Sequence, residues 1–157
     1  MGKDTEFSMK KQHKTFSDII GDFANAPYNE NGWGQEGVVG YSCLGLCYAY
    51  CQKRGFELPE EVKSLKFDGL AIDTFHEYAK HHKGVALIKL LKLFQSIGKD
   101  VPLSQKIAGD LVLVKADNET YPAIFVGNGQ VMAAYLDMGV KILTCNDKNK
   151  IIVVRRL

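Results

Sequence analysis

The C-terminal third of the chain has a two-residue apolar period, and this pattern constrains the fold more than any other feature. From Gly109 onward, short runs rich in β-branched residues alternate with turn residues such as Gly127-Asn128-Gly129. The runs are LVLVKA, AIFVG, QVMAAYL, VKILT and KIIVVRR. Because each connection is short, neighbouring runs are expected to pair antiparallel. The pattern therefore predicts a five-stranded antiparallel sheet.

The residues before this sheet have helical patterns instead. Residues 15–27 predict a short helix with Thr15 or Ser17 as its cap. Cys43–Arg54 is the strongest helical segment, with small or apolar residues on nearly every side and Gly55 at a left-handed cap position. Helices followed by strands indicate an α+β domain.

Composition and charge exclude several classes of protein. The 157 residues are 46% hydrophobic, which suits one domain with a core. Lys and Arg number 20 against 18 Asp and Glu, a formal net charge of +2, so no nucleic-acid partner is implied. No stretch reaches the roughly 18 apolar residues of a membrane span, and the N-terminus lacks a signal-peptide core. We therefore expect no membrane insertion and no signal peptide, and either a cytoplasmic protein or one that reaches another place as part of a larger assembly.

Three cysteines lie four residues apart on the strongest helix: Cys43, Cys47 and Cys51. The helix dipole favours a thiolate at the first turn, so Cys43 is a candidate nucleophile. Zinc would need a fourth ligand and usually binds Cys-x-x-Cys turns, so no metal site is predicted and Cys47 and Cys51 are interpreted as buried small hydrophobes. No cofactor is predicted, because the glycine-rich segment 127–129 joins two strands rather than opening a helix.

A cysteine at the start of a buried helix, followed by a five-stranded sheet, resembles the layout of papain-like cysteine peptidases. Several motifs are similar to those of the NlpC family of bacterial and phage cell-wall peptidases. In chain order they are Pro27-Tyr28, Gly32-Trp33-Gly34, Tyr41–Leu46, Gly55-Phe56, Leu58-Pro59, Gly109–Val112 and Thr120–Gly127. The absence of a signal peptide and a long middle region make the chain similar to phage tail-tip proteins of this family.

The resemblance implies a papain-like fold with N-terminal helices packed on the five-stranded sheet. It implies a single domain over residues 1–157, with an N-terminal arm at 1–14 and a helical insertion at 60–108. Within that insertion, residues 74–82 and 85–97 have helical patterns.

The resemblance also implies roles for residues around the cysteine. It puts Cys43 at the nucleophile position and Tyr28 on the oxyanion side. It puts Ser42, Leu44 and Gly45 beside the substrate, although the family has Asp and Ser where this chain has Ser42 and Leu44.

Two further catalytic positions depart from the family pattern. The histidine that opens the family's second strand corresponds to Tyr121, and the third polar residue corresponds to Ala133. A phenol with a pKa near 10 cannot act as a base near neutral pH, and alanine orients nothing. A replacement base would have to come from the middle region, where His76, His81 and His82 lie, or from His13 in the arm.

These departures favour a catalytically degenerate domain that serves as a structural or docking part of a phage tail tip. Its partners would then be other tail proteins, with peptidoglycan as a further ligand, and its location the virion tail if phage-encoded. The alternative is an active peptidase or amidase on peptidoglycan stem peptides, with Cys43 as nucleophile and His76 or a partner's histidine as base. An acyl-transfer enzyme is a third reading, and it shares the missing histidine.

Overall fold

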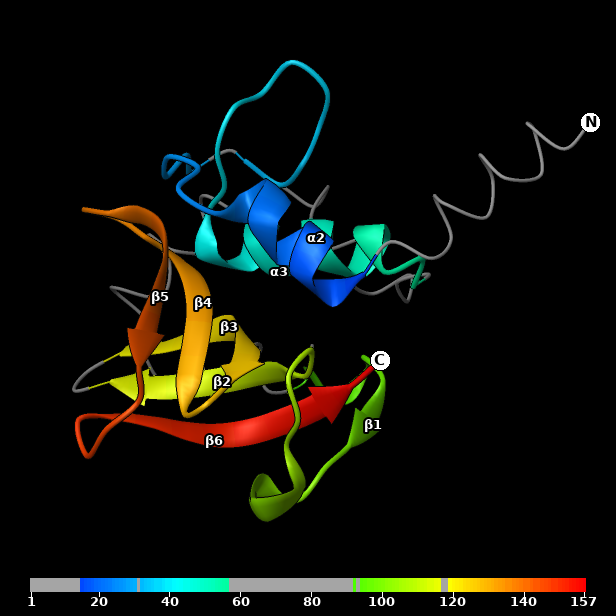
Figure 1. Cartoon of the computed structure of the whole chain (residues 1–157), viewed down its shortest axis with the longest axis vertical. Coiled ribbons are helices and arrows are strands. Elements are labelled where there is room, and N and C mark those ends of the chain that lie inside the picture. The colour runs from blue at the N-terminus through cyan, green and yellow to red at the C-terminus, as the bar shows by residue number, and fades with distance from the viewer. Residues whose placement is uncertain (1–14, 31, 57–91, 93, 117–118) are drawn as a thin grey trace, which may run out of the picture.

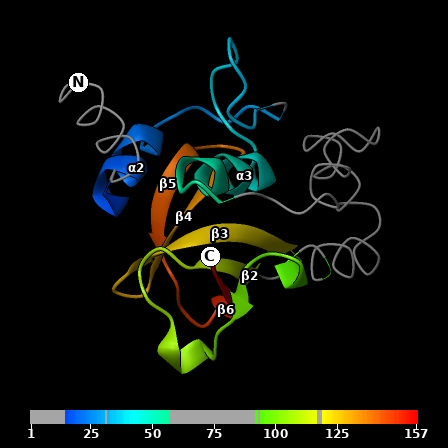
Figure 2. The ribbon, with the colours of Figure 1, turned by 90° about the vertical axis from the view of Figure 1, so that its right-hand side faces the viewer.

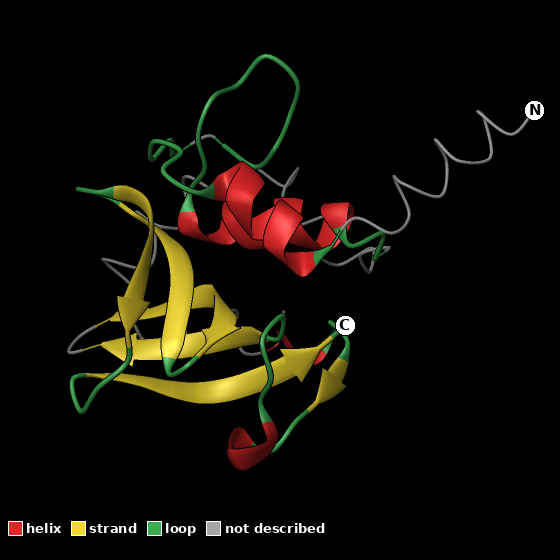
Figure 3. Cartoon of the chain, viewed as in Figure 1, coloured by secondary structure: helices red, strands yellow, loops and turns green. Residues whose placement is uncertain are grey.

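The computed structural model describes residues 15–30, 32–56, 92, 94–116 and 119–157, and the account below concerns these residues. Two helices lie on one side of a strongly curved sheet (Figure 1). Figure 3 shows the same division into a helical layer and a stranded layer. The helices are α2 (Phe16–Phe23) and α3 (Cys43–Lys53), and a short 3₁₀ helix, η1, covers Leu103–Gln105.

The sheet has six strands, all paired antiparallel, in the order β1-β6-β2-β3-β4-β5. Their bounds are β1 Lys99–Asp100, β2 Leu111–Ala116, β3 Glu119–Gly127, β4 Gln130–Tyr135, β5 Gly139–Thr144 and β6 Asn149–Arg156. The α+β class and the five predicted strands are confirmed, and β1 is an additional short strand.

Strand β1 corrects the end of the expected helical insertion. Residues 92, 94 and 95 are helical, as expected near the end of the 85–97 segment, but Lys99–Asp100 is a strand and η1 follows. Gly98 has a φ of +60° and turns the chain at this point. Arg155 of β6 then donates hydrogen bonds to the carbonyl oxygens of Gln95, Ile97 and Gly98. The expected arm at 1–14 and the helix at 74–82 lie outside the described residues.

Helix α2 begins with a capping box. The Thr15 hydroxyl accepts a hydrogen bond from the Asp18 amide at 3.1 Å, and the Thr15 amide donates to the Asp18 carboxylate at 3.4 Å. Thr15 is therefore the cap, one of the two candidates from the sequence. The helix ends at Phe23, before Pro27, because Asn25 turns the chain with a φ of +64°.

Two apolar clusters lie on the two sides of the sheet. The first cluster joins the helices to the sheet, and Figure 2 shows α2 and α3 stacked on that side. The second cluster lies on the other side of the strands. Because successive side chains of a strand point to opposite faces, neighbouring residues of β3 and β4 alternate between the clusters. On the helix side lie Leu111, Leu113, Ile124, Met132 and Ala134, and on the other side lie Val112, Val114, Ala123, Phe125, Val131 and Ala133.

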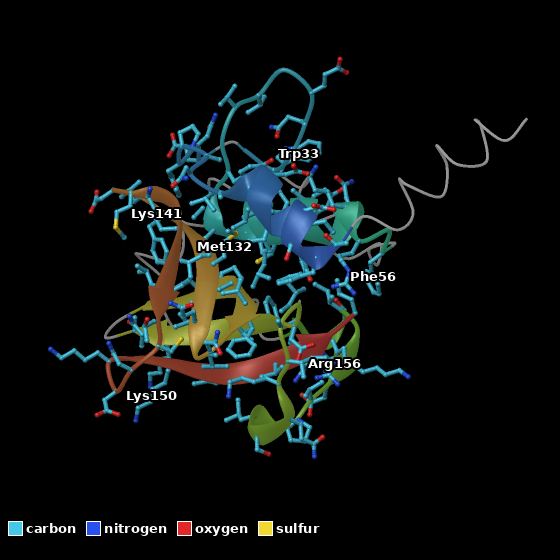
Figure 4. All side chains as sticks on the ribbon, viewed as in Figure 1. Trp33, Phe56, Met132, Lys141, Lys150 and Arg156 are labelled. Atoms are coloured by element: carbon cyan, nitrogen blue, oxygen red, sulfur yellow. The ribbon has the colours of Figure 1, made fainter. Side chains whose placement is uncertain are left out.

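Two polar contacts fix the start of β2 beneath α3. The hydroxyl of Tyr50 donates a hydrogen bond to the Gly109 carbonyl oxygen at 2.6 Å and accepts one from Arg54. The buried carboxylate of Asp110 accepts two hydrogen bonds from the Arg156 guanidinium, both at 2.9 Å. Such a bidentate pair fixes orientation as well as position, so it ties the end of β6, where Figure 4 labels Arg156, to the start of β2.

None of the helices in the described part of the chain has the length and apolar character needed to cross a bilayer.

Candidate active site

Cys43 is the first residue of α3, where the sequence placed it. Ser42 is the N-cap, with extended backbone, and its hydroxyl accepts a hydrogen bond from the Gly45 amide at 3.0 Å. The side chain of Cys43 is half-buried and its thiol is free of any disulfide. A thiol at this position lies in the positive field of the helix N-terminus, which favours the thiolate.

Ser42 is occupied by its structural role. Its side chain is fully buried, and its hydroxyl also donates to the Gly32 carbonyl oxygen at 3.4 Å, while its amide donates to the same oxygen at 3.0 Å. The hydroxyl thus uses its one hydrogen inside the protein and has no exposed surface. The structure therefore places Ser42 as the cap that positions Cys43, with no open path to a ligand.

Leu44 and Gly45 lie in the packing around the helix start. Leu44 is buried in the first cluster. A Cβ atom on Gly45 would lie 1.8 Å from the Gly32 carbonyl oxygen, so any side chain at position 45 would displace the loop. The absence of a side chain at Gly45 lets the loop backbone reach the helix N-terminus.

Tyr28 is brought next to the cysteine turn through its backbone. Tyr28 and Tyr41 form a parallel β-bridge. The Asn29 amide donates a hydrogen bond to the Tyr41 carbonyl oxygen, and the Tyr41 amide donates one to the Pro27 carbonyl oxygen, both at 3.1 Å. Gly40, with a φ of +94°, makes this approach possible, because a Cβ there would lie 2.5 Å from the Pro27 carbonyl oxygen. The side chain of Tyr28 packs against the first cluster.

Trp33 anchors the loop that precedes the cysteine. Its ring meets that of Tyr48 edge to face, with 5.5 Å between the centroids, and its half-buried side chain packs on the first cluster. Figure 4 labels this residue beside the helical layer.

Cys47 and Cys51 are core residues, as the sequence indicated. Their exposed fractions are 4% and 1%, and both belong to the first cluster. Burial raises the pKa of Cys47 well above its ordinary value and that of Cys51 to about 12, so both stay protonated near neutral pH. No group of three or more possible ligands that could hold a metal occurs in the described ranges.

Tyr121 and Ala133 lie on the side of the sheet that faces away from α3. Ala133 is fully buried in the second cluster, and Tyr121 packs against that cluster from two residue pairs farther along the β3–β4 ladder, on the same face. The Tyr121 phenol shares a hydrogen bond of 3.3 Å with Tyr135, and the two rings meet edge to face. Burial raises the pKa of Tyr135, and its hydrogen bond with Tyr121 raises that pKa further. Neither phenol can serve as a base at neutral pH.

The helix side of β3 offers no base either. By alternation, Thr120, Pro122 and Ile124 occupy that side, and none of them carries a group that titrates near pH 7. The four histidines are His13, His76, His81 and His82, and all lie outside the described residues. In the part of the chain that is described, neither face of β3 supplies an imidazole.

Two relationships within this site were not found by sequence reasoning. Tyr135 is the partner of Tyr121, and Gly32 supplies the carbonyl that caps the turn before Cys43. The turn at 127–129 pairs Gly127 with Gln130 and would by itself place Leu136 opposite Tyr121. The register shift between Phe125 and Gly127 puts Tyr135 there instead, so the turn alone does not predict the first pairing. The motif Gly32-Trp33-Gly34 does not indicate this role of Gly32, because the contact joins residues ten positions apart.

The comparisons with known proteins agree with this architecture. The family model of the NlpC/P60 family matches residues 26–153. A mutant of the resuscitation promoting factor interacting protein RipA has a similar structure, with a TM-score of 0.52, 22% identity and coverage of 89% of this chain and 59% of that chain. The P60 domain of antigen MAP1272c from M. avium paratuberculosis gives a TM-score of 0.51 at 18% identity, covering 97% and 99% of the two chains. No curated protein matches.

These structural likenesses concern the fold alone, since the identities are low. This chain spans 59% of the RipA structure, so what RipA does as a whole protein is not carried over.

Proposed function

The chain belongs to the NlpC/P60 family, and from this premise we propose that it is a catalytically degenerate member that serves as a docking domain. Members of this family are cysteine peptidases that hydrolyse peptidoglycan. The proposed domain keeps their scaffold and the helix that presents Cys43. It does not keep a strand-borne base.

The observation that carries this proposal is the composition of β3 and β4. A thiol peptidase needs its base within hydrogen-bond reach of the sulfur, and the family takes that base from the strand where this chain has Tyr121. The described strands present Tyr121 and Tyr135 to each other, and Thr120 and Pro122 on the helix side. Losing the base of such a unit typically costs several orders of magnitude in rate.

We expect the docking partners to be other proteins of a phage tail tip, with peptidoglycan as a further ligand. The tail setting rests on the resemblance of the sequence, and the virion tail is the corresponding location. Under this proposal the domain uses the scaffold of a cell-wall enzyme for positioning, and binding to peptidoglycan need not be followed by cleavage.

A second candidate is an active cell-wall peptidase or amidase. The position of Cys43 at the first residue of a capped helix favours it, because that position stabilises a thiolate without help from the sheet. In this reading Cys43 attacks the peptide carbonyl, and a histidine such as His76, His81 or His82 takes the proton.

The experiment that tests the proposal incubates the full chain with purified peptidoglycan and with synthetic stem peptides. Soluble products are measured by mass spectrometry, and bound protein is measured by cosedimentation. We expect cosedimentation without any product that exceeds that of the Cys43→Ala variant. A product that the wild type releases and Cys43→Ala does not would overturn the proposal and establish the second candidate.

A further inference from the structure

The start of strand β5 is joined to the segment that follows α2. The Val140 amide donates a hydrogen bond to the Ala26 carbonyl oxygen at 2.8 Å. The side-chain ammonium of Lys141, which Figure 4 labels, donates to the Asn25 side chain at 2.9 Å. Residues 25–29, called the linking segment here, therefore lie against the first residues of β5.

The linking segment is also bridged to the turn before Cys43. The Tyr41 amide donates to the Pro27 carbonyl oxygen, and the Asn29 amide donates to the Tyr41 carbonyl oxygen. Tyr41 forms a further, antiparallel bridge with Trp33. Backbone hydrogen bonding thus continues from β5 through the linking segment to Tyr41, which precedes the N-cap of α3.

Gly139 is the residue of β5 that permits this close contact. A Cβ atom at this position would lie 2.5 Å from the Ala26 carbonyl oxygen and 3.2 Å from the Pro27 Cα atom. Both of these are backbone atoms, so they cannot rotate away as the end of a flexible side chain would. Any side chain at position 139 would therefore displace the linking segment.

We propose that Gly139 is a positioning residue for the Cys43 site, acting through the linking segment on the turn that begins α3. Displacing Pro27 breaks the hydrogen bond from the Tyr41 amide and frees the turn in front of the half-buried thiol. The proposal rests on the proposed function in one respect, which is that it takes the Cys43 turn as the site.

A turn glycine without a positioning role is the alternative explanation, because the φ of +76° at Gly139 by itself favours glycine. Gly129 separates the two explanations. It has a similar φ of +69°, and no atom lies within 4 Å of a Cβ added there. Gly129→Ala therefore introduces the same kind of backbone strain without the close contact, which makes it the matched control for Gly139→Ala.

The first test measures the rate at which iodoacetamide alkylates Cys43 in the full chain, read by peptide mass. At about pH 8.5, Gly139→Ala should react at least about threefold faster than the wild type, because the turn before the thiol loses its bridge. Gly129→Ala should stay within about twofold of the wild type. Equal rates for Cys43 in the two variants would overturn the proposal.

Cys47 and Cys51 supply an internal control in the same samples. Both are buried in the first cluster, so they are alkylated only when the core opens. Their rates in Gly139→Ala should change less than the rate of Cys43. A parallel rise of all three rates would mean that Gly139 only stabilises the fold, and it would overturn the proposal.

Hydrogen exchange of the wild type is a second test that needs no substitution. The amides of Val140 and Tyr41 should have protection factors within about fivefold of each other, because movement of the linking segment opens both hydrogen bonds. A larger difference would show that the two bridges open independently, and it would overturn the proposal. Neither test uses peptidoglycan, so a failure here is distinct from the release of product that would overturn the proposed function.

Discussion

Tyr121 and Tyr135 lie with their phenol oxygens 3.3 Å apart across β3 and β4, on the side of the sheet that faces away from α3. Position 121 is where the family resemblance expects a histidine. In this chain it belongs to an aromatic pair that packs on the second cluster. The pair gives position 121 a packing role in place of an acid–base role.

Replacing Tyr121 by histidine should not activate Cys43. The new imidazole would pack with the second cluster, on the side of the sheet away from α3, the helix that carries Cys43. We expect Tyr121→His to leave the rate of Cys43 alkylation at pH 6 to 7 within about twofold of the wild type. The readout is the mass of the Cys43 peptide after iodoacetamide treatment, with Tyr121→Phe as the matched control. A tenfold faster reaction in the histidine variant alone would show that β3 does aim this position at the cysteine.

Two glycine-to-alanine substitutions in helices should have opposite effects on stability. At Gly45 the added Cβ would lie 1.8 Å from the Gly32 carbonyl oxygen, so Gly45→Ala should lower the free energy of unfolding by about 2–3 kcal/mol. At Gly21 no atom lies within 4 Å of the added Cβ, so Gly21→Ala should raise that free energy by roughly 0.5–1 kcal/mol. Urea unfolding of both variants measures the difference. Equal effects of the same sign would contradict the close contact between the loop and α3.

The stability of the fold should fall in alkaline solution. Burial raises the pKa of Cys51 from 9.0 to about 12 and that of Tyr50 from 10.0 to about 12. Because the folded state favours the neutral forms, this stabilisation is complete below about pH 9 and is lost as the pH rises toward 12. Each group contributes a slope of at most about 1.4 kcal/mol per pH unit in that window.

Thermal unfolding between pH 8 and pH 11 checks this expectation. The midpoint temperature should decrease above pH 9, and Cys51→Ala should show a shallower decrease because one of the buried groups with a raised pKa is gone. An equally steep decrease in the variant would mean that ionisation of Cys51 does not contribute.

The local sequence pattern was sufficient for most of the fold. The cap at Thr15, the helix from Cys43 and the five strands after Gly109 follow from nearest-neighbour preferences and apolar periodicity. Strand β1 could not be predicted in this way. Its two residues lack a period of their own and pair with β6, more than fifty positions away.

The candidate site was predicted only in part for the same reason. The position of Cys43 at a helix start depends on local signals, and the structure has it there. The burial of Ser42 against Gly32 and the pairing of Tyr121 with Tyr135 depend on how distant segments meet. Motif matching aligned residues with catalytic positions, but it did not indicate which side of the sheet each one faces.

The central claim is that the described scaffold presents Cys43 without a base, and the pH dependence of its alkylation tests this most directly. The rate of iodoacetamide modification of Cys43 is measured from pH 5 to pH 10 by peptide mass, with Cys43→Ala as the blank. We predict a slow reaction at pH 6 that accelerates only above about pH 8, as an unassisted thiol does. A fast rate that stays constant well below pH 7 would contradict the claim, because the helix N-terminus alone, worth about 0.3–1 kcal/mol, lowers the thiol pKa by less than about one unit, and such a rate requires a neighbouring cation such as an imidazolium.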